Sequence, residues 1–323
     1  MLSIVEVQKM NQSKQMTDGA LFTGIFILLL LMARFIPAFI VIAIFLLPIP
    51  FVLYTFKYSW KPSLLMLAAA ILFTLFFETS VTLPLTVLVG IAGILIGTAI
   101  HQGLSPYETW GRGAIGFIAG LLFVVLFIQL VLQINWLEEI DIMVNDSMEM
   151  SQEIMGQYGI TDQTQAQELL KDQIELMQDL FPVVLALIAI VFAFLTQWVS
   201  YKLINRLENR QFRFPPFRSL RFPVVIIWVY FVALLFTFID LDPNSVFYLA
   251  VINIFTLTGV LMTIQGLSFI FFYANYKKWS KAIPILSVVL TLLLPFLLLY
   301  FVRIIGIIDL GFGLRDRIAQ RKK

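Results

Sequence analysis

Long apolar runs alternate with short polar turns along this chain, and two longer polar stretches of opposite charge interrupt the pattern. Acidic residues crowd residues 137–180, where Lys171 is the single base. Lys and Arg dominate residues 202–221, where Glu208 is the single acid. Because loops rich in Lys and Arg stay on the cytoplasmic side of a membrane, the basic stretch is predicted inside. One apolar run separates the two stretches, so the acidic stretch is predicted outside.

The apolar runs have the length of membrane crossings and predict an all-α, polytopic membrane helix bundle of about eight to ten transmembrane helices. Ser105, Pro106 and Glu108 have the order of a capping box with proline at the first helical position, so one helix is expected to begin at Pro106. The expected crossings cover residues 20–32, 35–56, 63–77, 81–100, 106–134, 182–203, 222–239 and 246–274.

The last apolar run, residues 282–313, is too long for a single crossing. About 32 residues of helix would measure about 48 Å, against a hydrocarbon core of about 30 Å. Pro295 lies inside the run and predicts a break. One crossing would place the basic tail outside, whereas two short segments would return it to the inside. We expect two segments, because the tail is rich in Arg and Lys.

The acidic stretch is predicted to form two amphipathic helices in an extracytoplasmic hairpin. Ile140, Met143 and Ile174 belong to apolar positions at near-helical spacing, and Gly156 and Gly159 interrupt the pattern. The apolar stripes must be covered, either by packing against each other, by the bilayer surface or by a partner. The expected division of the chain is a cytoplasmic N-terminus (1–19), N-terminal transmembrane helices (20–135), the acidic hairpin (136–181), C-terminal transmembrane helices (182–313) and a basic tail (314–323).

Composition agrees with a membrane protein. The chain is 60% hydrophobic and 13% charged, whereas soluble chains carry about 25% charged residues. It has no Cys, which excludes disulfides and thiolate metal sites. The polar residues 1–18 do not resemble a cleaved signal peptide, so the first apolar run is expected to be a retained helix.

No catalytic or nucleotide-binding motif is visible, and His101 is the single histidine. A metal site needs several converging ligands, so His101 is interpreted as an interfacial side chain. We therefore expect no enzyme activity, no metal or other cofactor, and no nucleic-acid partner.

Small residues at fourfold spacing allow helix backbones to approach closely. They serve either packing within the chain or docking onto a partner subunit. Docking fits the pair on the terminal helix best. The pairs are Ala20 and Gly24, Gly93 and Gly97, and Gly116 and Gly120.

Polar residues inside the later crossings are the candidates for a ligand or ion site, because such groups must face protein or a cavity. The candidates are Asn253, Thr256, Thr263, Gln265 and Asp309. Interhelical hydrogen bonds are the alternative for the uncharged residues. Asp309 contacts a ligand or pairs with Arg303 or Arg315. Arg34 and Arg303 either extend toward the membrane surface from helix ends or have a functional role.

Six short strings of this sequence stand out as a set: Thr17-Asp18-Gly19-Ala20, Leu47-Pro48-Ile49-Pro50-Phe51, Ser105-Pro106-Tyr107-Glu108-Thr109, Phe181-Pro182, Gln265-Gly266-Leu267-Ser268, and Gly306-Ile307-Ile308-Asp309 followed by Arg315. Together they resemble the YybS-type bacterial membrane proteins, a family of unknown function. The resemblance covers about residues 17–317 and implies a multi-pass protein of the bacterial plasma membrane.

The resemblance also implies a distant grouping with the S components of energy-coupling-factor transporters. S components bind a vitamin from outside and dock through small residues of an early helix onto a membrane coupling subunit driven by ATPases. The implied function is a substrate-binding transporter subunit for a small nutrient. The alternative is a non-transporting scaffold that acts through the external hairpin or the basic inside loop.

Overall fold

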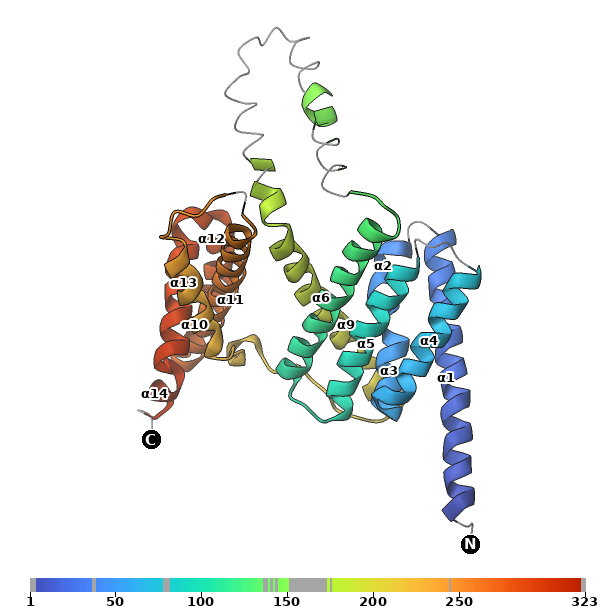
Figure 1. The fold of residues 1–323 in the computed structure, drawn as a ribbon. Helices are drawn as coiled ribbons and strands as arrows, with labels where there is room; N and C mark the ends of the chain where they lie inside the picture. Colours follow the sequence, from blue (N-terminus) through green and yellow to red (C-terminus); the bar gives the residue numbers. More distant parts are fainter. Residues whose placement is uncertain are drawn as a thin grey trace. The chain divides into compact units, whose positions relative to one another are not determined.

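The computed structural model describes residues 4–36, 39–77, 82–135, 139, 142, 145–150, 173–174, 176–243 and 245–320. Across these residues the chain is all-α, without a strand, which confirms the predicted helix bundle (Figure 1). The expected hairpin at residues 136–181 lies mostly outside the described residues.

Seven helices in the described part of the chain are long and apolar enough to cross a membrane. They are α1 (Ile4–Phe35), α4 (Trp60–Phe77), α5 (Leu83–His101), α6 (Pro106–Leu130), α9 (Phe181–Leu207), α11 (Val246–Tyr276) and α13 (Pro295–Phe312). Three shorter apolar helical stretches lie at residues 42–58, 225–236 and 282–293. The expected number of crossings, eight to ten, therefore exceeds the seven long helices and reaches ten when the three shorter stretches are included.

Proline and its neighbours explain where the shorter helices differ from the expected crossings. The expected helix at 35–56 is divided at Leu47 and Pro48 into α2 (Ile40–Leu46) and α3 (Ile49–Tyr58). The apolar run 222–239 forms only the 12-residue α10 (Val225–Phe236), because Pro223 precedes the first turn and residues 237–239 leave the helix. The first helix begins at Ile4 rather than near Ala20, so the polar N-terminal residues extend it.

Local signals act as expected at the start of α6. Ser105 Oγ accepts a hydrogen bond from the Glu108 N–H at 3.3 Å, and Glu108 Oε2 accepts one from the Ser105 N–H at 3.0 Å. These reciprocal bonds satisfy two helix-start donors, which is the capping box that the sequence predicts.

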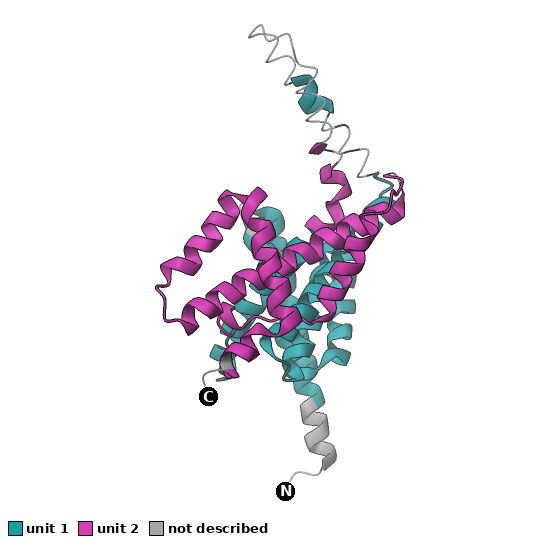
Figure 2. Ribbon diagram, turned by 90° about the vertical axis from the view of Figure 1, so that its left-hand side faces the viewer, with its two compact units in different colours: residues 1–170, 185–214 teal, residues 171–184, 215–323 magenta. Residues whose placement is uncertain are grey.

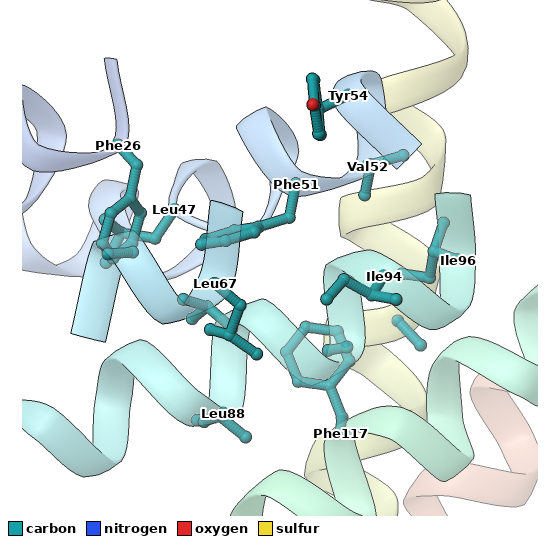
Figure 3. Close-up of a cluster of buried hydrophobic side chains, with 14 of the residues drawn as sticks. Phe26, Leu47, Phe51, Val52, Tyr54, Leu67, Leu88, Ile94, Ile96 and Phe117 are labelled. Atoms are coloured by element: carbon teal, nitrogen blue, oxygen red, sulfur yellow. The ribbon is translucent and has the colours of Figure 1, made fainter. Parts of the chain in front are cut away.

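The chain divides into two compact units, coloured separately in Figure 2. Unit 1 comprises residues 1–170 and 185–214, and its core includes Phe26, Phe51 and Phe117 (Figure 3). Helix α5 is its most buried span. Phe26 and Phe51 pack edge to face with ring centroids 5.1 Å apart, which joins α1 to α3.

Glycines allow α3 and α6 to approach α5 in unit 1. A Cβ on Gly93 would lie 2.6 Å from the Pro48 carbonyl oxygen, and one on Gly97 would lie 2.7 Å from that of Val52. On the other contact, a Cβ on Gly116 would lie 2.9 Å from Ala92 Cα, and one on Gly120 would lie 2.7 Å from Leu88 Cα. All four glycines therefore pack within the chain.

Unit 2 comprises residues 171–184 and 215–323 and is built around α11 and α13. The predicted break forms at Leu294, between α12 (Ala282–Leu293) and α13. Gly259 lies beside Arg303, Met262 beside Gly306 and Gln265 beside Asp309, so α11 and α13 run parallel. Their C-terminal ends lie at the same end of unit 2, and α12 connects them. The tail helix α14 (Leu314–Gln320) therefore follows at the end where the Lys277–Lys281 turn also lies.

Candidate functional site

A buried ion pair joins the end of α13 to the start of α14. Arg315 Nε donates to Asp309 Oδ2 at 2.9 Å, and the side chains are 6% and 0% exposed. Gln265 of α11 donates to the same oxygen through Nε2 at 2.6 Å. Two of the sequence-predicted site residues, Gln265 and Asp309, are therefore brought together. Arg315 is the partner of Asp309, as one of the predicted alternatives states.

The same network holds the short segment around η2 (Phe217–Ser219) against α11. Arg315 Nη1 donates to the carbonyl oxygens of Arg218 and Leu220 at 2.8 and 3.0 Å. Ser268 Oγ lies 2.8 Å from the Phe217 carbonyl oxygen, and the Phe222 N–H donates to Gln265 Oε1 at 3.1 Å. These bonds give side-chain partners to backbone groups in and after the short η2 segment.

One oxygen of this network has no protein partner among the described residues. Asp309 Oδ1 is buried and accepts no hydrogen bond. An unpartnered buried acceptor costs about 1–3 kcal/mol, so the network holds Asp309 at an energetic cost that its other bonds offset.

Outside this network, an exposed ion pair links the segment that follows η2 to α14. Arg221 donates to Asp316 through Nη1 and Nη2 at 3.1 and 2.7 Å. These charged hydrogen bonds hold the pKa of the Asp316 carboxyl below its usual range. The bond geometry is bidentate, but both side chains are exposed to solvent, which weakens the pair.

A second charge lies deeper in unit 2. Arg303 is near the middle of α13 and is 9% exposed. Its guanidinium lies over three aromatic rings, at 5.9 Å from the Tyr230 centroid, 5.8 Å from Phe255 and 5.3 Å from Tyr300. Among the described residues no carboxylate pairs with it, and its Nε has no hydrogen-bond acceptor. Arg303 therefore lies away from both ends of α13.

Gly259 makes room for this guanidinium. A Cβ at Gly259 would lie 2.8 Å from Arg303 Cζ and 3.0 Å from Nη2. The three rings come from α10, α11 and α13, and we call them with Gly259 the Arg303 cage. Tyr300 is 61% exposed.

The other predicted site residues lie apart from both charges. Asn253 Nδ2 donates to the Asp179 carbonyl oxygen at 2.7 Å, and its Oδ1 accepts from the Val183 N–H at 3.1 Å, so it ties α11 to the start of α9. Thr263 donates to the Gly259 carbonyl oxygen of its own helix at 2.9 Å. Thr256 is half-buried. Asn253 therefore contributes an interhelical contact and Thr263 an intrahelical one, and neither hydrogen-bonds to Asp309.

Small residues of α1 line a different cavity, in unit 1. Ala20 and Gly24 border an apolar groove of about 830 Å³ between α1 and α4. A Cβ at Gly24 would meet no heavy atom within 4 Å. Unlike the four glycines on α5 and α6, Gly24 has no close neighbour at its Cβ position among the described residues, and Ala20 is exposed.

No group of three or more His, Cys, Asp or Glu side chains in the described part of the chain could hold a metal ion. His101 Nδ1 lies 2.7 Å from the Phe56 carbonyl oxygen, which accounts for the histidine as a helix-end contact.

The helices and their composition define a multi-pass protein of the lipid bilayer. The chain belongs to the family described as "Predicted membrane protein (DUF2232)", which matches residues 24–310. It is also similar to a protein of Bacillus subtilis (strain 168) called "Uncharacterized protein YybS", with 27% identity over 310 residues, 96% of this chain and 100% of the relative. No solved structure matches. The resemblance to the YybS-type proteins is thus confirmed, whereas the distant likeness to S components is not shown.

Proposed function

We propose that this chain is a substrate-binding subunit of a plasma-membrane transporter and that it takes a small organic anion. The observation that carries the proposal is Arg303, a nearly buried charge in the middle of a crossing with no ionic partner among the described residues. Intramembrane charges are rare, and they mark binding sites and substrate pathways. The break before α13 adds support, because interrupted helices accompany binding sites in transporters.

The aromatic rings offset part of the free-energy cost of placing the Arg303 charge inside a membrane helix. Placing an arginine at the centre of a membrane helix costs about 2.5–3.5 kcal/mol on insertion scales. A cation–π contact contributes about 0.5–2 kcal/mol, so three rings offset most of that cost. Rings are poor hydrogen-bond acceptors, however, and a guanidinium has five N–H donors. The charge is thus tolerated while its hydrogen bonds remain available to a ligand.

The donors define the ligand class. A guanidinium donates two parallel hydrogen bonds to a carboxylate, a geometry that lysine does not reproduce. Tyr230, Phe255 and Tyr300 form an apolar surface suited to the organic body of the ligand. A small carboxylic acid with an apolar or aromatic part matches both features.

Arg303→Gln is expected to abolish retention of the anion. Losing a charged hydrogen-bonded contact costs about 1.5–3 kcal/mol, or about tenfold to a hundredfold in affinity. Native mass spectrometry of the purified full-length chain measures the mass and occupancy of any molecule that co-purifies. Arg303→Lys should recover only part of the occupancy, and Arg34→Gln, at the end of α1, should leave it unchanged.

Stability separates a binding role from a structural one. A buried charge without an ionic partner carries a desolvation cost that an apolar side chain of similar volume does not, so Arg303→Met should melt at or above the wild-type temperature in the absence of ligand. A wild-type protein that retains no small anion, or an Arg303→Met variant that unfolds, would contradict the proposal.

The coupling machinery is the second part of the proposal. The chain shows no nucleotide-binding motif, so a transporter of this kind would need ATPases and a membrane coupling subunit. The groove beside Ala20 and Gly24 offers such a subunit a surface of small residues. Affinity purification from the native membrane should recover an ATPase pair. Recovery of an unrelated protein instead would favour the scaffold, acting through the basic loop or the acidic residues 136–181.

The proposed orientation places the N-terminus and residues 202–221 in the cytoplasm and residues 136–181 outside. Because the chain has no Cys, single cysteines at Gln165 and Ser280 test it cleanly. An impermeant maleimide added to intact cells should label position 165 and spare position 280 until lysis. The reverse labelling order would invert the topology.

A further inference from the structure

A cavity of unit 2 lies at the turn between α11 and α12 and has a volume of about 520 Å³. Its walls come from η2, the end of α11 and the start of α12. Three basic side chains line it, Arg218, Lys278 and Lys281, and no acidic side chain does. Among the described residues none of these three bases forms an ion pair, so no described acidic side chain compensates their charge.

The backbone holds Lys278 at this cavity in a conformation that most residues avoid. Its φ is +58°, in the left-handed region that favours glycine. The Lys278 N–H donates to the Asn275 carbonyl oxygen at 3.2 Å, and the Trp279 N–H donates to that of Ala274 at 2.8 Å. These bonds end α11 in a turn whose left-handed position is usually glycine. Lys278 therefore adopts a less favourable backbone conformation than glycine would, and its side chain places a positive charge beside the cavity.

The Arg218 wall is held in place by the ion-pair network. Arg315 donates to the Arg218 carbonyl oxygen, and Ser268 contacts that of Phe217. The cavity therefore has a fixed side as well as cationic side chains, and a ligand need not order this segment when it binds.

Apart from Asn275 and Ser280, the rest of the lining is apolar, and this apolar surface continues onto an exposed helix face. Phe271, Pro284 and Ile285 line the cavity, and Ile285 is 54% exposed. Leu286 and Val289 continue this exposed apolar surface along α12. Trp279 lies at the cavity as well, and tryptophan is enriched where membrane meets water.

We propose that this cavity binds the phosphate of an anionic phospholipid, with an acyl chain lying along α12. Phosphate chemistry follows from the three bases, and basic pockets between membrane helices bind anionic lipid headgroups. The apolar wall selects a lipid over a free phosphate, because a soluble anion would leave Phe271 and Ile285 uncovered. The site is separate from Arg303, so it stands or falls independently of the transport proposal.

Native mass spectrometry of the full-length protein in a non-ionic detergent tests this site directly. Phosphatidylglycerol and phosphatidylcholine of matched acyl length are added in turn, and bound lipid is counted. Each base near an anionic headgroup is worth about 1 kcal/mol, or about fivefold in affinity. Phosphatidylglycerol should therefore bind the wild type at least fivefold better, and Lys278→Gly and Lys281→Gln should each lose about fivefold.

The turn supplies a matched control in the neighbouring base. Lys277 does not line the cavity, and its Nζ lies 5.9 Å from the Tyr273 ring centroid. Lys277→Gln should therefore leave lipid binding unchanged. Lys278→Gly should also melt at or above the wild-type temperature, because glycine relieves the positive φ, so that loss of lipid cannot be ascribed to unfolding.

Three outcomes would overturn the proposal. The first is equal binding of the two lipids to the wild type. The second is an equal loss on Lys277→Gln and Lys278→Gly. The third is displacement of phosphatidylglycerol by inorganic phosphate when chloride at the same ionic strength does not displace it, which would assign the cavity to a soluble phosphate.

Discussion

Gly306→Ala is expected to separate α11 from α13 and to destabilise unit 2 by about 3 kcal/mol or more, at the upper end of the range for overpacking. A Cβ at Gly306 would lie 1.9 Å from the Met262 carbonyl oxygen and 2.8 Å from the Gly266 nitrogen. Gly266 faces the same contact, since its Cβ would lie 1.9 Å from the Val302 carbonyl oxygen. The neighbours are backbone atoms, which cannot rotate away as a side chain would, so the helices themselves must move.

The loss should appear as a lower melting temperature and a lower yield of monodisperse protein in one detergent. Gly24→Ala is the matched control, because a Cβ there meets nothing within 4 Å and alanine favours helix over glycine by up to about 1 kcal/mol. If Gly306→Ala melts with the wild type, the close approach of α11 and α13 is wrong.

Features that depend on neighbouring residues could be predicted from the sequence. The capping box needs only Ser105 and Glu108, three positions apart. The break at Leu294 needs only Pro295, whose ring and missing N–H exclude it from a helix interior. Such signals act through one turn of backbone and do not require knowledge of the fold.

Contacts between segments that are distant in the sequence could not be predicted from such local patterns. Gly266 and Gly306 lie on different helices and pair only because α11 and α13 run parallel in one register. Neither belongs to a fourfold-spaced pair of small residues. The spacing that predicts close packing at Gly93 and Gly97 therefore does not predict it at Gly266 or Gly306. The same applies to the Arg303 cage, because in a chain with 31 Phe no spacing distinguishes Phe255.

The candidate site residues show what polarity in the sequence can predict and what it cannot. Gln265 and Asp309 were selected because polar groups in a crossing need partners, and they do contact each other. Asn253 met the same criterion, but it bonds to the backbone of another helix start. Polarity in a crossing thus predicts that a partner exists, whereas its identity depends on the packing of the helices.

Asp309→Asn is expected to destabilise unit 2 by about 3–5 kcal/mol, the cost of breaking a buried ion pair by removing one charge. The Arg315 guanidinium would stay buried with its charge uncompensated, while Gln265 would lose a charged acceptor. The segment that Arg315 holds through the Arg218 and Leu220 carbonyl oxygens would loosen with it. Protein abundance in the membrane and melting temperature in detergent measure the loss.

Two further variants separate the charge from the packing. Asp316→Asn removes an exposed acid of the neighbouring pair with Arg221 and should have little effect, since exposed pairs are screened by solvent. Asp309→Leu combined with Arg315→Met removes both buried charges and should recover much of the stability, because apolar side chains can replace a buried pair. If Asp309→Asn instead accumulates normally but loses ligand or partner binding, Asp309 belongs to the binding site, where its Oδ1 is free to accept a hydrogen bond. An unchanged protein in every assay would reduce Asp309 to an ordinary helix-end acid and would contradict the buried pair.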